Sequence, residues 1–181
     1  MQLTPTREQQ DEMRFAYFDG APGILVSGLV WLAAALVCYQ LGIEKAVWTL
    51  LIGGALIHPM GVVVTKALGR PAKTSAGNAL NQLAMASTIW LILCCAMAYG
   101  LFLLRPTLFF PAMMATIGSR YSVLASVFGR QIFWILGTSL LAGGGLAVFL
   151  AASPAIAAGL GGLIEVLFSV LMFARASRPA A

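Results

Sequence analysis

The chain consists mainly of long apolar runs, separated by short stretches that contain most of its polar and charged residues. Each run approaches the ~20 residues that a helix needs to cross a bilayer. Continuous runs are typical of transmembrane helices, whereas strands of a membrane barrel alternate apolar and polar positions over about ten residues. The pattern predicts an all-α membrane protein, a bundle of six transmembrane helices over residues 22–41, 46–66, 79–104, 107–128, 131–151 and 155–174.

The fourth run contains a charged residue, Arg120. If its helix ended there, the remaining segment 107–119 would be too short to cross a bilayer. We therefore expect the helix to continue to Phe128 and to accommodate one charged position. The connection between the fifth and sixth runs, around residues 152–154, is very short, so these two helices are expected to form an antiparallel hairpin.

The first twenty residues are polar and are expected to form a separate element. Pro5 suits a first helical turn, and Thr6 and Gln9 have capping-box spacing, so segment 4–18 predicts a short amphipathic helix. This helix would lie on the membrane surface, with disorder of the first ten residues as the alternative. The division is an N-terminal cytoplasmic or interfacial helix over 1–20, a six-helix transmembrane domain over 21–176 and a cytoplasmic tail over 177–181.

Asp19 and Gly20 join this N-terminal segment to the first span. Gly20 can end a helix in a left-handed conformation, so the pair is expected to form a turn. A second interpretation places the Asp19 carboxylate at the mouth of a site. The segment lacks the apolar core of a cleavable signal peptide, and insertion is expected to start at the first span.

The basic residues indicate an orientation. If the N-terminus lies in the cytoplasm, the inner side receives Arg7, Arg14, Lys66, Arg70, Lys73, Arg130, Arg175 and Arg178, and the outer side only Lys45 and Arg105. Positive charge is enriched in cytoplasmic loops. We therefore expect a multi-pass protein of the cytoplasmic (inner) membrane with both termini in the cytoplasm.

Composition supports this interpretation and excludes others. The chain of 181 residues is 60% hydrophobic and 9% charged, whereas soluble domains carry roughly 25% charged residues. Its mean hydropathy is +0.92. The net charge of +5 comes from scattered basic residues without an aromatic platform, so a nucleic-acid partner is not expected. The expected partners are the lipid bilayer and a small-molecule or ion ligand.

Three ionisable residues lie at similar depth in the three spans that run from outside to inside. His58, Arg120 and Glu165 each precede the inner end of their span by eight or nine residues, about 12–14 Å along a helix. Charged groups in hydrocarbon are rare and usually face a partner or a water-filled cavity. These three residues are our candidates for ligand binding or proton linkage.

Each candidate has a structural alternative. Arg120 and Glu165 can form an ion pair that only holds the bundle together, or they can line a functional cavity; snorkelling and incorrect span boundaries are further alternatives. His58 precedes Pro59, which removes a helical hydrogen bond and is our candidate hinge. His58 can face a ligand at this kink, or be a neutral histidine that is hydrogen-bonded within the bundle.

Polar residues near the inner side are candidates for the mouth of a cavity: Asp19, Asn78, Asn81 and Gln82. Asn78 is also a natural N-cap for the third span. Asn81 and Gln82 would line an inward-opening vestibule or bind a neighbouring helix.

No known catalytic or metal-binding motif occurs in the chain. With one histidine and no cysteine pair near it, a zinc or haem site is not expected, and no cofactor is predicted. Cys38, Cys94 and Cys95 are interpreted as small core residues. Small residues such as Gly53-Gly54 and Gly143-Gly144-Gly145 permit close helix contact; packing within one chain is the main interpretation, and a homo-oligomer through these faces is the alternative.

The middle of the chain, over residues 20–145, resembles a bacterial family of small multi-pass membrane proteins known only as a domain of unknown function. The matching features are His58-Pro59 before Lys66, the segment 78–83 with Asn78 and Asn81, and the segment from Pro111 to Gly118-Ser119-Arg120. The resemblance implies a fold of membrane helices and implies no known activity.

Together these observations favour a small transporter, channel or ligand-binding membrane protein with an inward-facing polar cavity. The alternatives are a non-catalytic structural or regulatory membrane subunit and, third, an intramembrane enzyme that modifies lipid. Nothing in the sequence favours an enzyme over the other two classes.

Overall fold

The computed structural model describes residues 6–176. Over this range the chain forms seven α-helices and two 3-10 turns, and no strand occurs within it. The helices are α1 Thr6–Tyr17, α2 Ala21–Leu41, α3 Ile43–Ala67, α4 Leu80–Leu104, α5 Phe109–Phe128, α6 Ile132–Phe149 and α7 Pro154–Ala176, and the turns are η1 Phe18–Gly20 and η2 Pro106–Leu108.

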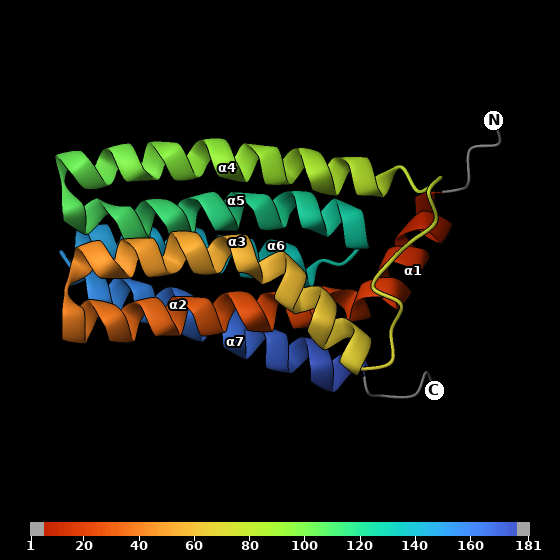
Figure 1. Cartoon of the computed structure of the whole chain (residues 1–181). Helices are drawn as coiled ribbons and strands as arrows, with labels where there is room; N and C mark the ends of the chain where they lie inside the picture. Colours follow the sequence, from red (N-terminus) through yellow and green to blue (C-terminus); the bar gives the residue numbers. More distant parts are fainter. Residues whose placement is uncertain (1–5, 177–181) are drawn as a thin grey trace.

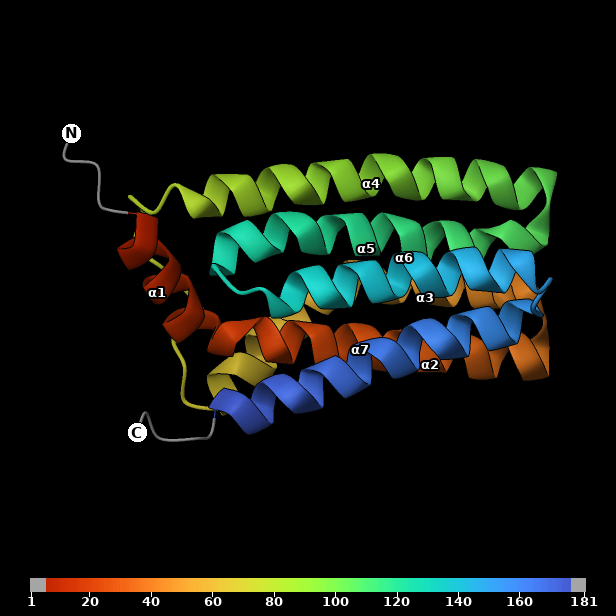
Figure 2. The same ribbon diagram turned by 180° about the vertical axis from the view of Figure 1, so that it is seen from behind.

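The six long helices, α2 to α7, run side by side along one axis, and α1 lies across one end of the bundle (Figure 1). We call this the α1 end. Successive long helices run in opposite directions, so the chain returns to the α1 end after every second one. The opposite end contains only short connections (Figure 2).

Five segments are long and apolar enough to cross a membrane, by length and composition. They contain or correspond to α2, α3, α4, α6 and α7, which confirms five of the six expected spans closely in position. α5 is a helix of 20 residues with Arg120 in its interior, and it does not meet the same measure. That α5 also crosses the membrane stays a prediction.

Glycines bring two pairs of long helices into backbone contact. A Cβ atom at Gly28 of α2 would come within 2.9 Å of the backbone N of Val166 in α7. A Cβ atom at Gly118 of α5 would come within 2.7 Å of the carbonyl O of Gly137 in α6. Such distances leave no room for a side chain, so these glycines serve packing within one chain.

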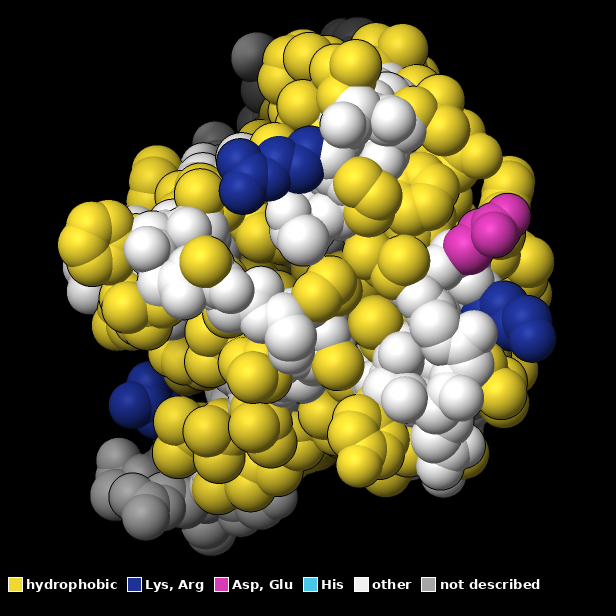
Figure 3. Space-filling view, turned by 90° about the vertical axis from the view of Figure 1, so that its left-hand side faces the viewer, with side chains coloured by type: hydrophobic (Ala, Val, Ile, Leu, Met, Phe, Trp, Pro, Cys, Tyr) yellow, Lys and Arg dark blue, Asp and Glu magenta, His cyan; other side chains and the backbone are white. Residues whose placement is uncertain are grey.

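α3 and α4 are the most exposed long helices. α3 packs mainly on α2, and α4 packs mainly on α5. Near the end opposite α1, the rings of Trp48 and Tyr99 join α3 to α4 at a centroid distance of 5.7 Å. Seen from this end, the bundle shows mostly apolar side chains and backbone, and charged groups are few (Figure 3).

Pro59 lies inside α3, as the sequence predicts. α3 is straight over its first part and then turns toward the α1 end (Figure 1), which is the effect expected of a proline within a helix. α6 and α7 follow each other after a short connection, as expected. They nevertheless separate toward the α1 end (Figure 2).

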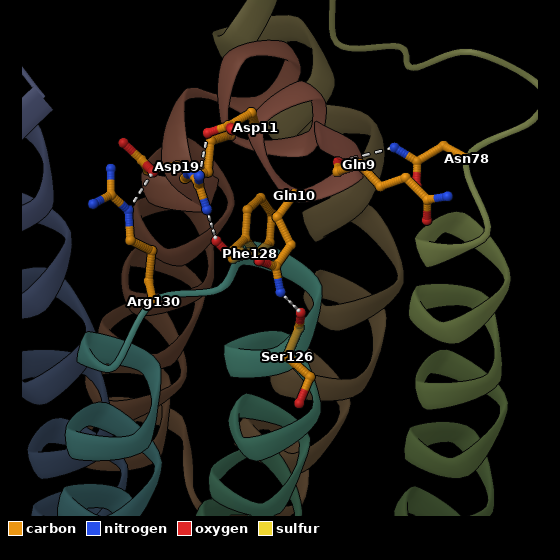
Figure 4. Close-up of polar contacts among 9 residues, drawn as sticks. Gln9, Gln10, Asp11, Asp19, Asn78, Ser126, Phe128 and Arg130 are labelled. Carbon is orange, nitrogen blue, oxygen red and sulfur yellow. Dashed lines mark hydrogen bonds and ion pairs between the residues drawn. The ribbon is translucent and has the colours of Figure 1, made fainter. Parts of the chain in front are cut away.

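α1 is attached to the bundle by hydrogen bonds from both of its sides (Figure 4). Gln10 donates to the carbonyl O of Ser126 at 2.8 Å, and Arg14 donates to the carbonyl O of Phe128 at 2.7 Å. The Asn78 amide donates to the carbonyl O of Gln9 at 3.0 Å. The expected N-terminal helix is therefore confirmed from Thr6 to Tyr17; residues 1–5 and the predicted tail 177–181 lie outside the described residues.

Candidate functional site

Glu165 is fully buried between three helices. Its Oε1 atom accepts a hydrogen bond of 2.7 Å from the Tyr121 hydroxyl of α5, and the Ser27 hydroxyl of α2 lies beside the same carboxyl group. Its Oε2 atom has no donor in good geometry among the described residues. Glu165 is therefore anchored mainly by one tyrosine.

Arg120 turns away from Glu165 and toward α4. Its Nη2 atom donates to Thr88 Oγ1 at 3.1 Å, and its Nε atom is buried without a hydrogen-bond partner in the part of the chain that the structure describes. Within residues 6–176, Glu165 forms no ion pair, and Arg120 attracts it only at longer range. The ion pair considered from the sequence is thus not formed, because neighbouring positions on α5 point to different helices: Tyr121 to α7 and Arg120 to α4.

His58 is exposed on α3 and has no hydrogen bond to another described side chain. The equal depth of the three candidates therefore does not bring them into one cavity. Equal depth fixes the position of a residue along the helix axis but leaves its direction around the helix free, and the direction differs at each of the three positions.

The polar residues at the start of α4 hold local structure. Asn78 Oδ1 accepts from the backbone N of Leu80 at 3.0 Å, which gives Asn78 its expected capping contact, and its amide binds Glu12 of α1 at 2.8 Å. Asn81 bonds to Thr74 at 2.7 Å. Gln82 is exposed. None of these three asparagine and glutamine side chains lines either of the hollows described next.

Asp19, in contrast, lines two adjoining hollows at the α1 end. The basic hollow, of about 240 Å³, is lined by Arg14, Phe15, Phe18, Asp19, Arg70, Arg130 and Arg175. The side hollow, of about 280 Å³, is lined by Asp19, Arg130, Gln131, Ile132, Met172 and Arg175. The two share Asp19, Arg130 and Arg175.

The arginines of the basic hollow come from four separate segments of the chain: α1, the α3–α4 loop, the α5–α6 loop and α7. Arg130 Nε binds Asp19 Oδ1 at 3.1 Å (Figure 4), and Arg14 pairs with Asp11. The Arg70 guanidinium lies over the Phe15 and Phe18 rings, at 4.5 and 5.3 Å from their centroids. Arg175 has no ion pair within residues 6–176.

A left-handed turn positions Asp19 between these arginines. Phe18, Asp19 and Gly20 have φ values of 52°, 54° and 82°. Gly20 adopts this region without a steric cost, but the other two residues do not, and such conformations persist only where the surroundings hold them. The expected turn at Asp19-Gly20 is confirmed, and it directs the carboxylate into both hollows.

Comparison with protein-family models gives a match to DUF7010, described as a family of unknown function, over residues 6–175. The chain belongs to the DUF7010 family. The match extends from α1 to α7 and thus covers every element that lines the hollows. No curated protein and no solved structure matches the chain.

For this DUF7010 protein, the sequence pointed to Asp19 but not to the arginines around it. Sequence reasoning assigned Arg14, Arg70, Arg130 and Arg175 to membrane orientation alone. A usable signal was present: all four lie next to span ends expected on the same side, so they gather wherever the loops meet.

Proposed function

We propose that this DUF7010 protein is a ligand-binding membrane protein whose inward-facing polar cavity is the basic hollow, and that its ligand carries a phosphate or similar anionic group. The observation that supports this most is the charge of the hollow: four arginines surround one carboxylate, Asp19. An anion would balance this excess of positive charge.

The chemistry of the side chains fits such a ligand. A guanidinium group is planar, permanently charged and able to bind phosphate oxygens through two parallel hydrogen bonds. Arg175 has no ion pair in the described range, and Arg70 rests on two aromatic rings instead of a carboxylate. Both guanidinium groups therefore keep hydrogen-bond donors for a ligand. Asp19, by holding Arg130, keeps a third donor at the rim.

The excess of basic residues at the α1 end also supports the cytoplasmic orientation of this end. In this orientation the hollow faces the cytoplasm at the membrane surface. His58, Arg120 and Glu165 do not line it, so the proposal assigns ligand binding to the site and does not require a transport step.

The test uses the purified protein in mild detergent, with inorganic pyrophosphate as the probe and calorimetric titration as the measurement. We expect Arg130→Gln and Arg175→Gln each to weaken binding by at least tenfold, because each removes a charged donor. Arg105→Gln is the matched control, since Arg105 lies at the opposite end. No pyrophosphate binding by the wild-type protein, or equal loss in all three variants, would refute the proposal.

A further inference from the structure

The two hollows share three residues but differ in the rest of their lining. The basic hollow continues from the shared residues toward α1, with two more arginines and two phenylalanines. The side hollow continues toward the first turn of α6 and the last turns of α7, where Ile132 and Met172 contribute apolar walls. A small inorganic anion has no use for these apolar walls.

The side hollow lies where α6 and α7 separate. These helices are joined closely at the end opposite α1 and are farther apart at the α1 end (Figure 2). Ile132 is the first residue of α6, and Met172 lies near the end of α7. The side hollow therefore connects the shared arginines with the flank of the bundle, where lipid chains lie if the apolar helices span a bilayer.

The arginines are also at the correct level for a lipid head group. Arg130 lies in the loop before α6, and Arg175 lies in the last turn of α7. The ends of membrane-spanning helices reach the head-group region, and basic pockets there bind anionic head groups. A lipid can thus place its phosphate in the basic hollow while its chains remain in the membrane.

We infer that the ligand is an anionic phospholipid, whose phosphate binds the arginines of the basic hollow and whose chain leaves through the side hollow between α6 and α7. This inference rests on the proposed function and adds the class of the ligand. A free phosphate compound would use the same arginines, but its binding would be independent of the apolar walls.

The experiment compares a lipid with a free anion on the same variants. Wild-type protein is titrated with dioleoyl phosphatidylglycerol in detergent and, separately, with pyrophosphate. Ile132→Trp places a large ring in the side hollow. We expect it to weaken lipid binding at least tenfold and to change pyrophosphate binding less than twofold. Ile135→Trp is the matched control, because Ile135 is exposed on the same helix and lines neither hollow; we expect no effect on either probe.

The outcomes separate the two proposals. If Ile132→Trp leaves lipid affinity unchanged, or weakens both probes equally, the lipid is excluded as the intended ligand while the anion site stands. If Arg130→Gln changes neither titration, the proposed function itself fails. If the tryptophan variant does not fold, Ile132→Ser removes apolar contact without adding bulk, and the same direction is expected. Dioleoyl phosphatidylcholine is the head-group control and should bind at least tenfold more weakly.

Discussion

At the scale of single residues, burial and direction matter more than depth along a helix. Glu165 sits in a dry contact between α2 and α7, with Gly28 and Gly162 close by. Its surroundings offer one strong donor, the Tyr121 hydroxyl. A buried acceptor that loses its donor costs free energy, because the lost contact is not replaced by water. The contact between Tyr121 and Glu165 is therefore expected to stabilise the fold.

Replacing Tyr121 with phenylalanine tests this contact. Tyr121→Phe removes only the hydroxyl and leaves Glu165 buried without its donor, so we expect the free energy of unfolding in mild detergent to fall by about 1–3 kcal/mol. Tyr39→Phe is the control, because Tyr39 is 83% exposed. In a double-mutant cycle with Glu165→Gln, the coupling energy to Tyr121 should exceed the coupling to Arg120, which forms no ion pair with Glu165 in the described range. A larger Arg120 coupling would contradict the structure.

At the scale of elements, α1 is held against the bundle by a carboxylate. Glu12 accepts hydrogen bonds from the backbone N and hydroxyl of Ser75, and from the Asn78 amide. The Ser75 backbone hydrogen bond, followed by that of Asn78, lowers the pKa of Glu12 from its ordinary 4.5. These bonds favour the ionised form, so ionised Glu12 fixes α1 to the loop between α3 and α4.

The lowered pKa sets the direction of a pH effect. A carboxylate with a pKa lowered in the docked state supports docking above its ordinary pKa, and this support is lost as the pH falls through the lowered value. We therefore expect α1 to loosen as the pH falls from 7 to below 4.5. Spin labels at Arg7→Cys and Lys73→Cys should report a broader distance distribution at low pH.

The matched variants are Glu12→Gln and Glu8→Gln, both on α1. Glu12→Gln should broaden the distribution already at pH 7 and reduce its change with pH, whereas Glu8, an exposed carboxylate without a hydrogen bond to the loop in the described part of the chain, should have no effect when changed. A distance distribution that stays narrow at low pH, or an equal response in both variants, would show that Glu12 does not hold α1.

At the scale of the whole molecule, the helices could be predicted from the sequence and the site could not. Span positions follow from the length of the apolar runs, because lipid-exposed backbone must be helical, and the expected range 79–104 becomes α4 at Leu80–Leu104. Side-chain direction depends on which helices become neighbours, which is why Arg120 was expected near Glu165 but binds Thr88. The basic hollow needs four distant segments to meet, and no local pattern encodes such a meeting.

The orientation of the bundle and the crossing of α5 are decided by one labelling experiment. Single cysteines at Glu44→Cys and Arg105→Cys lie at the end opposite α1, and Gln131→Cys lies at the α1 end. The background is a chain whose native cysteines are replaced by alanine. In intact cells, a membrane-impermeant maleimide should label the first two and leave Gln131→Cys unlabelled until the membrane is permeabilised. Because Arg105 and Gln131 flank α5, opposite accessibility at these two positions requires α5 to cross the bilayer, despite Arg120. Labelling of Gln131→Cys together with Arg105→Cys would mean that α5 does not cross, and labelling of Gln131→Cys alone would place the basic hollow outside the cell.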